Sequence, residues 1–284
     1  MNRKLMRTLA FAIGLCVATQ AGALGRLGSG AENLLNFGKK AADATREMTE
    51  EEEIALGREL AARVLGAAPL VEDQELQRYV NRVGMWLALQ SERPDLPWRF
   101  GVIQSRSVNA FATPGGTVLI TAGLYDRLRD ESELAGVLGH EIVHIVRKHQ
   151  LEAIKKAAGR ALFSDLAGEA ISRSGDQAVR MFGDEVLNAG MNIFASGLDK
   201  ADEYDADLRG MVIAARGGYN PYGLVGVLQT LDSSGAGNAS GMKLMLSTHP
   251  NPGDRIERLL DAVGERLEPY SGNPTPGRLY RPAR

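Results

Sequence analysis

The chain has 284 residues, of which 44% are hydrophobic and 24% are charged, with 33 Lys and Arg against 35 Asp and Glu. This composition excludes a disordered, collagen-like or coiled-coil protein, and the length is enough to bury a core without disulfide staples. The formal charge is −2 and no stretch is both strongly basic and rich in aromatics, so we expect no nucleic-acid partner.

The first 23 residues have the pattern of a secretory signal peptide. Three cations within the first seven residues precede a largely apolar run over 9–18, and an Ala-Gly-Ala sequence at 21–23 offers the small residues of a cleavage site. The apolar run has roughly half of the ~20 residues that a spanning helix needs. We therefore expect cleavage after Ala23, export, and no spanning helix in the mature chain.

Cys16 lies within this leader, and it raises the alternative of a lipid anchor. Acylation requires a small residue directly before the cysteine, and Leu15 stands there instead. Because Cys16 is the one cysteine of the chain, cleavage after Ala23 leaves no thiol that could form a disulfide or bind a metal.

Two helices are expected after a flexible lead-in over 24–48, which is rich in Gly and Ala. Thr49 and Glu52 have the spacing of a capping box, and apolar residues follow at helical spacing as far as Gly66. A second helical pattern covers 73–88 and ends before two prolines.

A small antiparallel sheet is expected next. Residues 98–104 have a strand-like pattern, and two further apolar runs at 108–112 and 117–122 flank a Thr-Pro-Gly-Gly turn at 113–116, which indicates a hairpin. We expect the strand over 117–121 to form a sheet edge.

The rest of the chain is predicted to be mainly helical. Asp130 with Glu133 has the pattern of a helix start, and the helical pattern continues to about Lys155. Further stretches follow in chain order: a mostly helical region at 156–198, a helix at 200–216, a short helix after Pro221, a Ser/Gly loop at 233–241 and a last helix at 254–267. The fold class is therefore α+β and mostly helical, with a single domain over 49–270 and a loose tail over 271–284.

The helix that starts at Asp130 contains His140-Glu141-Ile142-Val143-His144. Two histidines four residues apart lie on one helix face about 6 Å apart along the axis, so both imidazoles can reach one metal ion at about 2.0–2.1 Å. Glu141 is rotated by about 100° from His140, close enough to the open side of such an ion to hold a water without being a ligand. The alternative is a solvated helix face, but an adjacent stripe of apolar residues favours a half-buried cleft wall.

Two histidines leave a tetrahedral zinc site one protein ligand short. The mature chain offers no cysteine, and Arg147 and Gln150 replace the glycine and histidine of the extended metzincin pattern, so a carboxylate remains. Glu203 is the best candidate, because it forms an i, i+4 pair with Asp207 on the helix at 200–216. The alternative interpretation is that Glu203 belongs to an acidic turn exposed to solvent, because three more aspartates lie in the same stretch.

In this interpretation Glu203 binds the metal, and Asp207 accepts the outer N–H of a zinc-bound histidine and fixes its tautomer. Small residues at Gly210 and Ala214 would let this helix pack closely on the helix of His140, at a turn that contains Gly136.

Several other segments have motifs in a fixed order: NAFATPGG at 109–116, TAGL at 121–124, ELAGVLGHE at 133–141, EYDAD at 203–207, THP at 248–250 and RI at 255–256. Together they resemble the M48 zinc metallopeptidases, over about 49–267. The likeness is to the soluble, exported bacterial branch of that family. It departs from the membrane-embedded branch, because charged residues interrupt 156–198 and leave no apolar span of ~20 residues there.

The resemblance implies a zincin-like catalytic domain of the gluzincin type over 49–270. It implies one Zn²⁺ per chain, held by His140, His144 and Glu203, with Glu141 as the general base that activates water together with zinc. The reaction that this implies is the hydrolysis of a peptide bond.

His249 and Arg255 are two further catalytic candidates. His249 lies in a Pro- and Gly-rich loop, where three roles stay open: a contact at the entry of the last helix, a donor to the developing oxyanion, or a temporary occupant of zinc's fourth position that moves away for substrate. Arg255 is either a second oxyanion donor or a salt-bridge partner of an acidic neighbour.

An extended substrate is expected to add to the edge strand as a further strand. The candidate substrate contacts are Asn109, Ala110, Phe111, Thr117, Val118 and Leu119. Binding through the substrate backbone predicts broad preference, with unfolded segments favoured.

The sequence therefore predicts a zinc endopeptidase that acts on unfolded polypeptides. The resemblance to the exported branch implies a periplasmic location, possible peripheral association with the outer membrane, and misfolded outer-membrane or periplasmic proteins as substrates or partners. Two alternatives are an envelope chaperone or binding protein with a structural zinc site and a zinc hydrolase that acts on other substrates. A structural zinc site usually has four protein ligands and no use for Glu141, which favours the enzyme.

Overall fold

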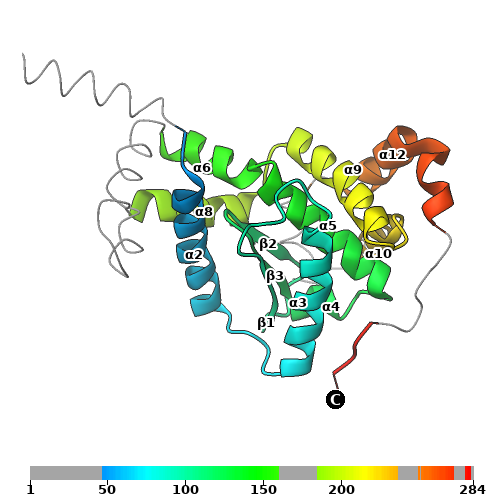
Figure 1. The fold of residues 1–284 in the computed structure, drawn as a ribbon, viewed down its shortest axis with the longest axis horizontal. Helices are drawn as coiled ribbons and strands as arrows, with labels where there is room; N and C mark the ends of the chain where they lie inside the picture. Colours follow the sequence, from blue (N-terminus) through cyan, green and yellow to red (C-terminus); the bar gives the residue numbers. More distant parts are fainter. Residues whose placement is uncertain (1–46, 160–183, 236–248, 250, 272–278, 283–284) are drawn as a thin grey trace, which may run out of the picture.

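The computed structural model describes residues 47–159, 184–235, 249, 251–271 and 279–282. Its helices surround a small central sheet, and the buried helix that contains the two histidines runs between this sheet and the helices of the C-terminal part (Figure 1). The predicted signal peptide, Cys16 and nearly all of the lead-in lie outside the described residues, as do the centre of the 156–198 stretch and most of the Ser/Gly loop.

The first two predicted helices are confirmed. Helix α2 spans Glu50–Ala67, and Thr49 and Glu52 form the expected capping box at its start. Helix α3 spans Gln74–Ala88, with the side chain of Asp73 accepting a hydrogen bond from the first turn. Such caps satisfy backbone N–H groups that have no partner within the helix.

The sheet has three strands in the order β1-β3-β2: β1 (Arg99–Ile103), β3 (Thr117–Thr121) and β2 (Ala110–Thr113). The hairpin of β2 and β3 is confirmed as antiparallel. However, β1 pairs with β3 in parallel, so the sheet is mixed and not antiparallel throughout.

The prediction that 117–121 forms a sheet edge is wrong. Strand β3 lies in the centre, and its side chains Val118, Leu119 and Ile120 are all buried. Burial of apolar side chains lowers the free energy of the folded state, and a strand with apolar residues on both faces buries most surface at the centre of a sheet. Strand β2 forms an edge of the sheet in its place.

The tip of the hairpin packs on helix α2. Gly115 has φ +76°, and a Cβ built there would lie 2.5 Å from the Cα of Ile54, so this turn requires glycine. The N–H of Gly115 donates to Oε1 of the buried Glu53 over 3.2 Å. This contact anchors β2 and β3 to α2.

The single helix predicted from Asp130 to about Lys155 is in fact two helices. Helix α5 spans Glu131–Val146 and α6 spans His149–Ala158. Between them Lys148 has φ 60°, a left-handed conformation that ends a helix. A short helix α4 (Ala122–Tyr125), which the sequence reasoning did not identify, follows β3 directly.

The remaining elements follow the predicted order. They are α8 (Asp184–Ser196), α9 (Lys200–Arg216), α10 (Gly223–Gly235), α12 (Pro252–Val263) and the 3₁₀-helix η2 (Gly264–Tyr270). The helix predicted at 200–216 is confirmed as α9. Within the described residues, no helix combines the length and the apolar character that a membrane span requires.

Helices α5 and α9 pack closely through Gly210, as predicted, but the facing glycine of α5 is Gly139 and not Gly136. Gly210 of α9 faces Gly139 of α5, whereas Gly136 faces Leu224 of α10. The two glycines of α5 are separated by almost one turn, and each admits a different neighbouring helix.

The prediction of a loose tail is wrong for residues 279–282. Leu279 is buried in the main core, and the hydroxyl of Tyr280 donates to Asp73 at the start of α3. The backbone carbonyl of Tyr280 accepts from the hydroxyl of Tyr125. This segment therefore packs against the start of α3 and against α4.

Candidate metal centre

His140 and His144 lie one turn apart on the same face of α5. Their side chains are 5% and 1% exposed, and their Nε2 atoms face each other across 3.0 Å. Burial, followed by the neighbouring His140, lowers the pKa of His144 well below its usual range. The neutral imidazole that results is the form that binds a metal.

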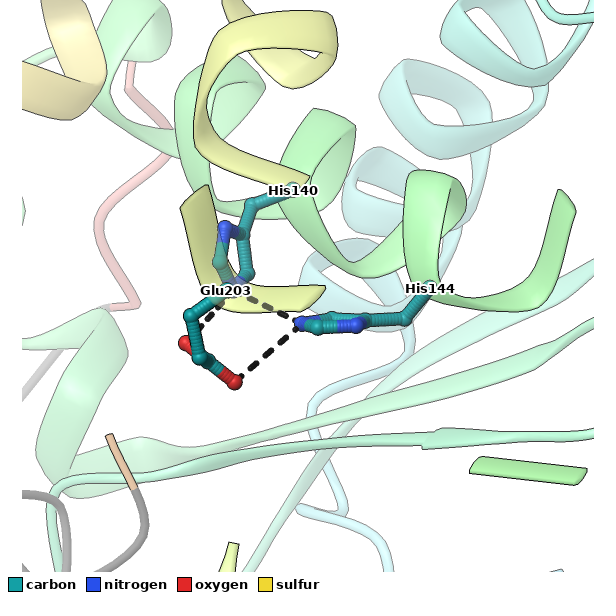
Figure 2. A group of neighbouring side chains, drawn as sticks. All are labelled: His140, His144 and Glu203. Carbon is teal, nitrogen blue, oxygen red and sulfur yellow. Dashed lines mark hydrogen bonds and ion pairs between the residues drawn. The ribbon is translucent and has the colours of Figure 1, made fainter. Parts of the chain in front are cut away.

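Glu203 reaches the same point from helix α9. Its Oε2 lies 3.6 Å from Nε2 of His140, and its Oε1 lies 3.5 Å from Nε2 of His144. Figure 2 shows the three side chains pointing toward one another. The structure thus brings together the two histidines and the carboxylate that were predicted as metal ligands.

These three residues fit a zinc ion. Zinc bonds of about 2.0–2.1 Å to nitrogen or oxygen place the ligand atoms of a tetrahedral site about 3.3 Å apart, close to the observed distances of 3.0 to 3.6 Å. In the described part of the chain, Oε1 of Glu203 is buried and accepts no hydrogen bond. A bound cation would satisfy this oxygen, and two imidazoles with one carboxylate are a donor set that suits zinc.

Asp207 lies next to the ring nitrogen of His140 that faces away from Glu203 and His144. Its Oδ1 lies 2.9 Å from Nδ1 of His140, and both side chains are buried. Arg255 donates to both carboxylate oxygens of Asp207, from Nε over 2.8 Å and from Nη2. Burial alone would raise the pKa of Asp207, but the positive charge and hydrogen bonds of Arg255 outweigh it and hold that pKa below its usual range. Asp207 therefore stays ionised and can accept the outer N–H of His140.

Arg255 forms a salt bridge with an acidic neighbour, which is one of its two predicted roles. Its guanidinium is buried and paired with Asp207. Arg255 also lines a small pocket together with Glu141 and His249, and its role as an oxyanion donor stays a prediction.

Glu141 lies beside the three ligands. Its side chain is buried, and burial raises the pKa of its carboxyl, against the opposing effects of His140 and His249. The residue lines two small pockets, and His249 lines both of them as well. Glu141 therefore shares a pocket with His144 and Glu203.

His249 contacts the third ligand directly. Its Nδ1 donates to Oε2 of Glu203 over 2.6 Å. Burial would raise the pKa of Glu203, but this contact and the nearby His144 and His140 lower it overall, so Glu203 is a carboxylate. The position at the metal ligands is compatible with both functional roles predicted for His249.

Edge strand β2 borders the centre. Asn109, Ala110 and Phe111 line a pocket together with Glu141 and His144. Thr117, Val118 and Leu119, which were predicted as substrate contacts on an edge strand, instead lie on the central strand β3 and do not line this pocket.

The sequence reasoning missed one residue that contacts the centre. Nδ1 of His149 lies 3.0 Å from Nδ1 of His144. In a continuous helix, a residue five positions after His144 would point elsewhere. The spacing therefore gives no signal for this contact, which depends on the break at Lys148.

Comparisons with known proteins agree with this geometry. The family model for Peptidase family M48 matches residues 73–263. The chain is 28% identical over 208 residues to a beta-barrel assembly-enhancing protease of Yersinia pestis, which covers 72% of this chain and 43% of the relative. It is 28% identical over 187 residues to the mitochondrial metalloendopeptidase OMA1 of Schizosaccharomyces pombe, covering 66% and 53%.

A third relative is a protease HtpX homolog of Salinibacter ruber, which is 28% identical over 235 residues, or 72% of this chain and 81% of the relative. The chain spans less than half of the length of the beta-barrel assembly-enhancing proteases that it matches.

Proposed function

Because this chain belongs to peptidase family M48, we propose that it is a zinc-dependent endopeptidase that hydrolyses unfolded or misfolded proteins of the cell envelope. One observation carries the proposal: His140, His144 and Glu203 converge in a buried site where a carboxylate oxygen of Glu203 accepts no hydrogen bond from a described residue. Glu141, which is not needed as a ligand, lies next to this site.

The three ligands would hold one zinc ion per chain. When bound, zinc polarises the substrate carbonyl and lowers the pKa of a bound water from about 15.7 toward about 7. Among the described residues, three candidate ligands converge on the group, and such a set would leave one position of a tetrahedral zinc ion for water or substrate.

Glu141 carries the proton in the proposed reaction. As the water oxygen attacks the carbonyl carbon, a carboxylate oxygen of Glu141 accepts the proton that water loses. When the C–N bond breaks, Glu141 returns that proton to the departing nitrogen. Burial raises the pKa of Glu141, which makes the residue a stronger base than an exposed glutamate would be.

Asp207, Arg255 and His249 assist this step in different ways. Asp207 holds His140 with its Nδ1 protonated and its Nε2 directed at the site, and Arg255 keeps Asp207 ionised. For His249 two roles fit its contact with Glu203: donation to the oxyanion, or occupation of the open position until substrate arrives.

The proposed substrate is an extended peptide that pairs with β2. An edge strand presents unpaired backbone groups, and a peptide that adds to it is recognised through its main chain. The contacts we propose are Asn109, Ala110 and Phe111, which line the pocket beside Glu141. Recognition of this kind requires an unfolded segment and tolerates many sequences.

The cell envelope is proposed from the sequence and from the names of relatives. The predicted signal peptide at 1–23 would direct export to the periplasm, and one group of relatives is named for the enhancement of β-barrel assembly. We propose that outer-membrane or periplasmic proteins are substrates, with peripheral association at the outer membrane.

A digestion assay tests this function. The purified protein should degrade a chemically unfolded substrate such as reduced casein, lose the activity with a zinc chelator, and recover it when one equivalent of zinc is restored. Activity that survives exhaustive zinc removal would overturn the proposal. Binding of unfolded protein by the zinc-loaded protein with no cleavage would support the chaperone alternative instead.

A further inference from the structure

His149 contacts the candidate metal centre through the ring of His144. The chain has four histidines, and His149 is the one that neither the motif nor the proposed reaction uses. It is 9% exposed, and its ring stands at 74° to the ring of His144 with the centroids 5.1 Å apart. Its Nδ1 faces Nδ1 of His144 across 3.0 Å.

The break between α5 and α6 creates this contact. Consecutive residues of an α-helix are rotated by about 100°, so a residue five positions after His144 would point about 140° away in a continuous helix. Lys148, at φ 60°, ends α5 and makes His149 the first residue of α6. The Lys148 ammonium lies 3.3 Å from Oε2 of the buried Glu53, which helps to hold this unusual backbone conformation.

The hydrogen-bond chemistry assigns a direction to the contact. A neutral histidine that binds a metal through Nε2 carries its proton on Nδ1. Two Nδ1 atoms at 3.0 Å need one donor and one acceptor, so His144 donates and His149 accepts. The proton of His149 is then on Nε2, which lies 3.7 Å from Oδ1 of Asp202 and 3.8 Å from Oδ2 of Asp205. Both carboxylates lie within 4 Å of that nitrogen, and their negative charge favours a proton there.

We propose that His149 is a positioning residue of the metal centre. By accepting the Nδ1–H of His144, it fixes the tautomer and the ring orientation in which Nε2 of His144 faces Glu203. Asp207 lies 2.9 Å from Nδ1 of His140, so each histidine ligand would have its own outer partner. This inference rests on the proposed function, because it concerns a zinc ion bound by His144.

The test compares variants that remove or keep the acceptor. All are made in a Glu141→Gln parent, so that self-digestion does not interfere. His149→Leu removes the acceptor, whereas His149→Asn places an amide oxygen near the position of Nδ1. Asp199→Asn is the matched control, because its carboxylate lies near the start of α9 and is 82% exposed.

Zinc affinity, measured by competition with a chromogenic chelator, is the first readout. His149→Leu should bind zinc 10 to 100-fold more weakly than the parent, as is typical when an outer partner of a metal ligand is lost. His149→Asn should stay within about threefold, and Asp199→Asn should be unchanged. If His149→Leu does not fold, as judged by thermal unfolding, His149→Phe takes its place.

Long-range ¹H–¹⁵N correlation spectra of the zinc-saturated proteins give the second readout. The parent and His149→Asn should show a protonated Nδ1 at His144 that exchanges slowly with water, and His149→Leu should lose that protection. Equal zinc affinity of His149→Leu and the parent, or equal weakening in His149→Leu and His149→Asn, would overturn the role of His149. Failure of the wild-type protein to bind zinc or to digest casein would instead refute the proposed function.

Discussion

Gly210 of α9 packs directly against the backbone of Gly139 in α5. A Cβ built on Gly210 would lie 2.8 Å from the backbone nitrogen of His140, and one built on Gly139 would lie 2.8 Å from the carbonyl oxygen of Gly210. Neither neighbour is a side chain that could move away. This close approach brings Glu203, which is on the same helix as Gly210, within reach of the two histidines.

Gly210→Ala should therefore separate α5 from α9. We expect a loss of about 1–3 kcal/mol in the free energy of unfolding, as for other overpacked cores, together with weaker zinc binding. Urea unfolding and zinc titration measure the two effects. Gly66→Ala is the matched control, because a Cβ there would meet nothing within 4 Å. Equal stability and zinc affinity of Gly210→Ala and the wild-type protein would contradict the packing argument.

Glu141→Gln should keep zinc and lose catalysis. The amide has nearly the shape of the carboxylate but cannot accept the proton from water, so the rate of casein cleavage should fall by about 10²–10⁴-fold. Metal analysis of the purified variant should show the zinc content of the wild-type protein. Glu152→Gln, at an exposed carboxylate on α6, should cleave normally. Wild-type turnover by Glu141→Gln would mean that another group is the base.

His249→Ala should change the rate of cleavage while the zinc content stays the same. Loss of an oxyanion donor would lower kcat by about 10²–10³-fold, whereas removal of an occupant of the open position would raise the rate at low substrate concentration. The direction of the change thus separates the two roles. Unchanged turnover in a full substrate titration would eliminate both.

Asp207→Ala should destabilise the protein strongly, because it leaves the guanidinium of Arg255 buried without its partner. Breaking a buried ion pair in this way costs about 3–5 kcal/mol, which urea unfolding can measure. Arg78→Ala, which removes an exposed ion pair with Glu75, should cost less than about 1 kcal/mol. Should the two losses be equal, the buried pair is not the support that we describe.

Local patterns in the sequence were enough to predict much of the centre. The spacing of His140 and His144 needs only one helix, and the i, i+4 pair of Glu203 and Asp207 needs only a second. The capping box of Thr49 and Glu52 likewise depends on contacts within four residues, and the structure confirms it. In each case the sequence separation alone fixes which side chains share a face.

Features that depend on distant contacts could not be predicted in this way. The insertion of β3 between β1 and β2 follows from the burial of its apolar residues on both sides, which a hairpin pattern does not encode. The break at Lys148 has no compositional signal, because lysine rarely adopts a positive φ. The contact of His149 with His144 depends on that break, so it was missed as well.

The packing of the tail and the partners of the two glycines could not be predicted for the same reason. Residues 279–282 are close to prolines and glycines, which favour a loop, yet Leu279 and Tyr280 pack on residues about 150 to 200 positions earlier. Gly136 and Gly139 lie on nearby parts of α5, and only the placement of α9 and α10 decides which helix each one meets.

The anomalous diffraction of crystals of this protein at the zinc absorption edge tests the central claim most directly. We predict one peak per chain, about 2.0–2.2 Å from Nε2 of His140, Nε2 of His144 and a carboxylate oxygen of Glu203. A peak held by other residues, or no peak at these three side chains after soaking in zinc, would contradict the account.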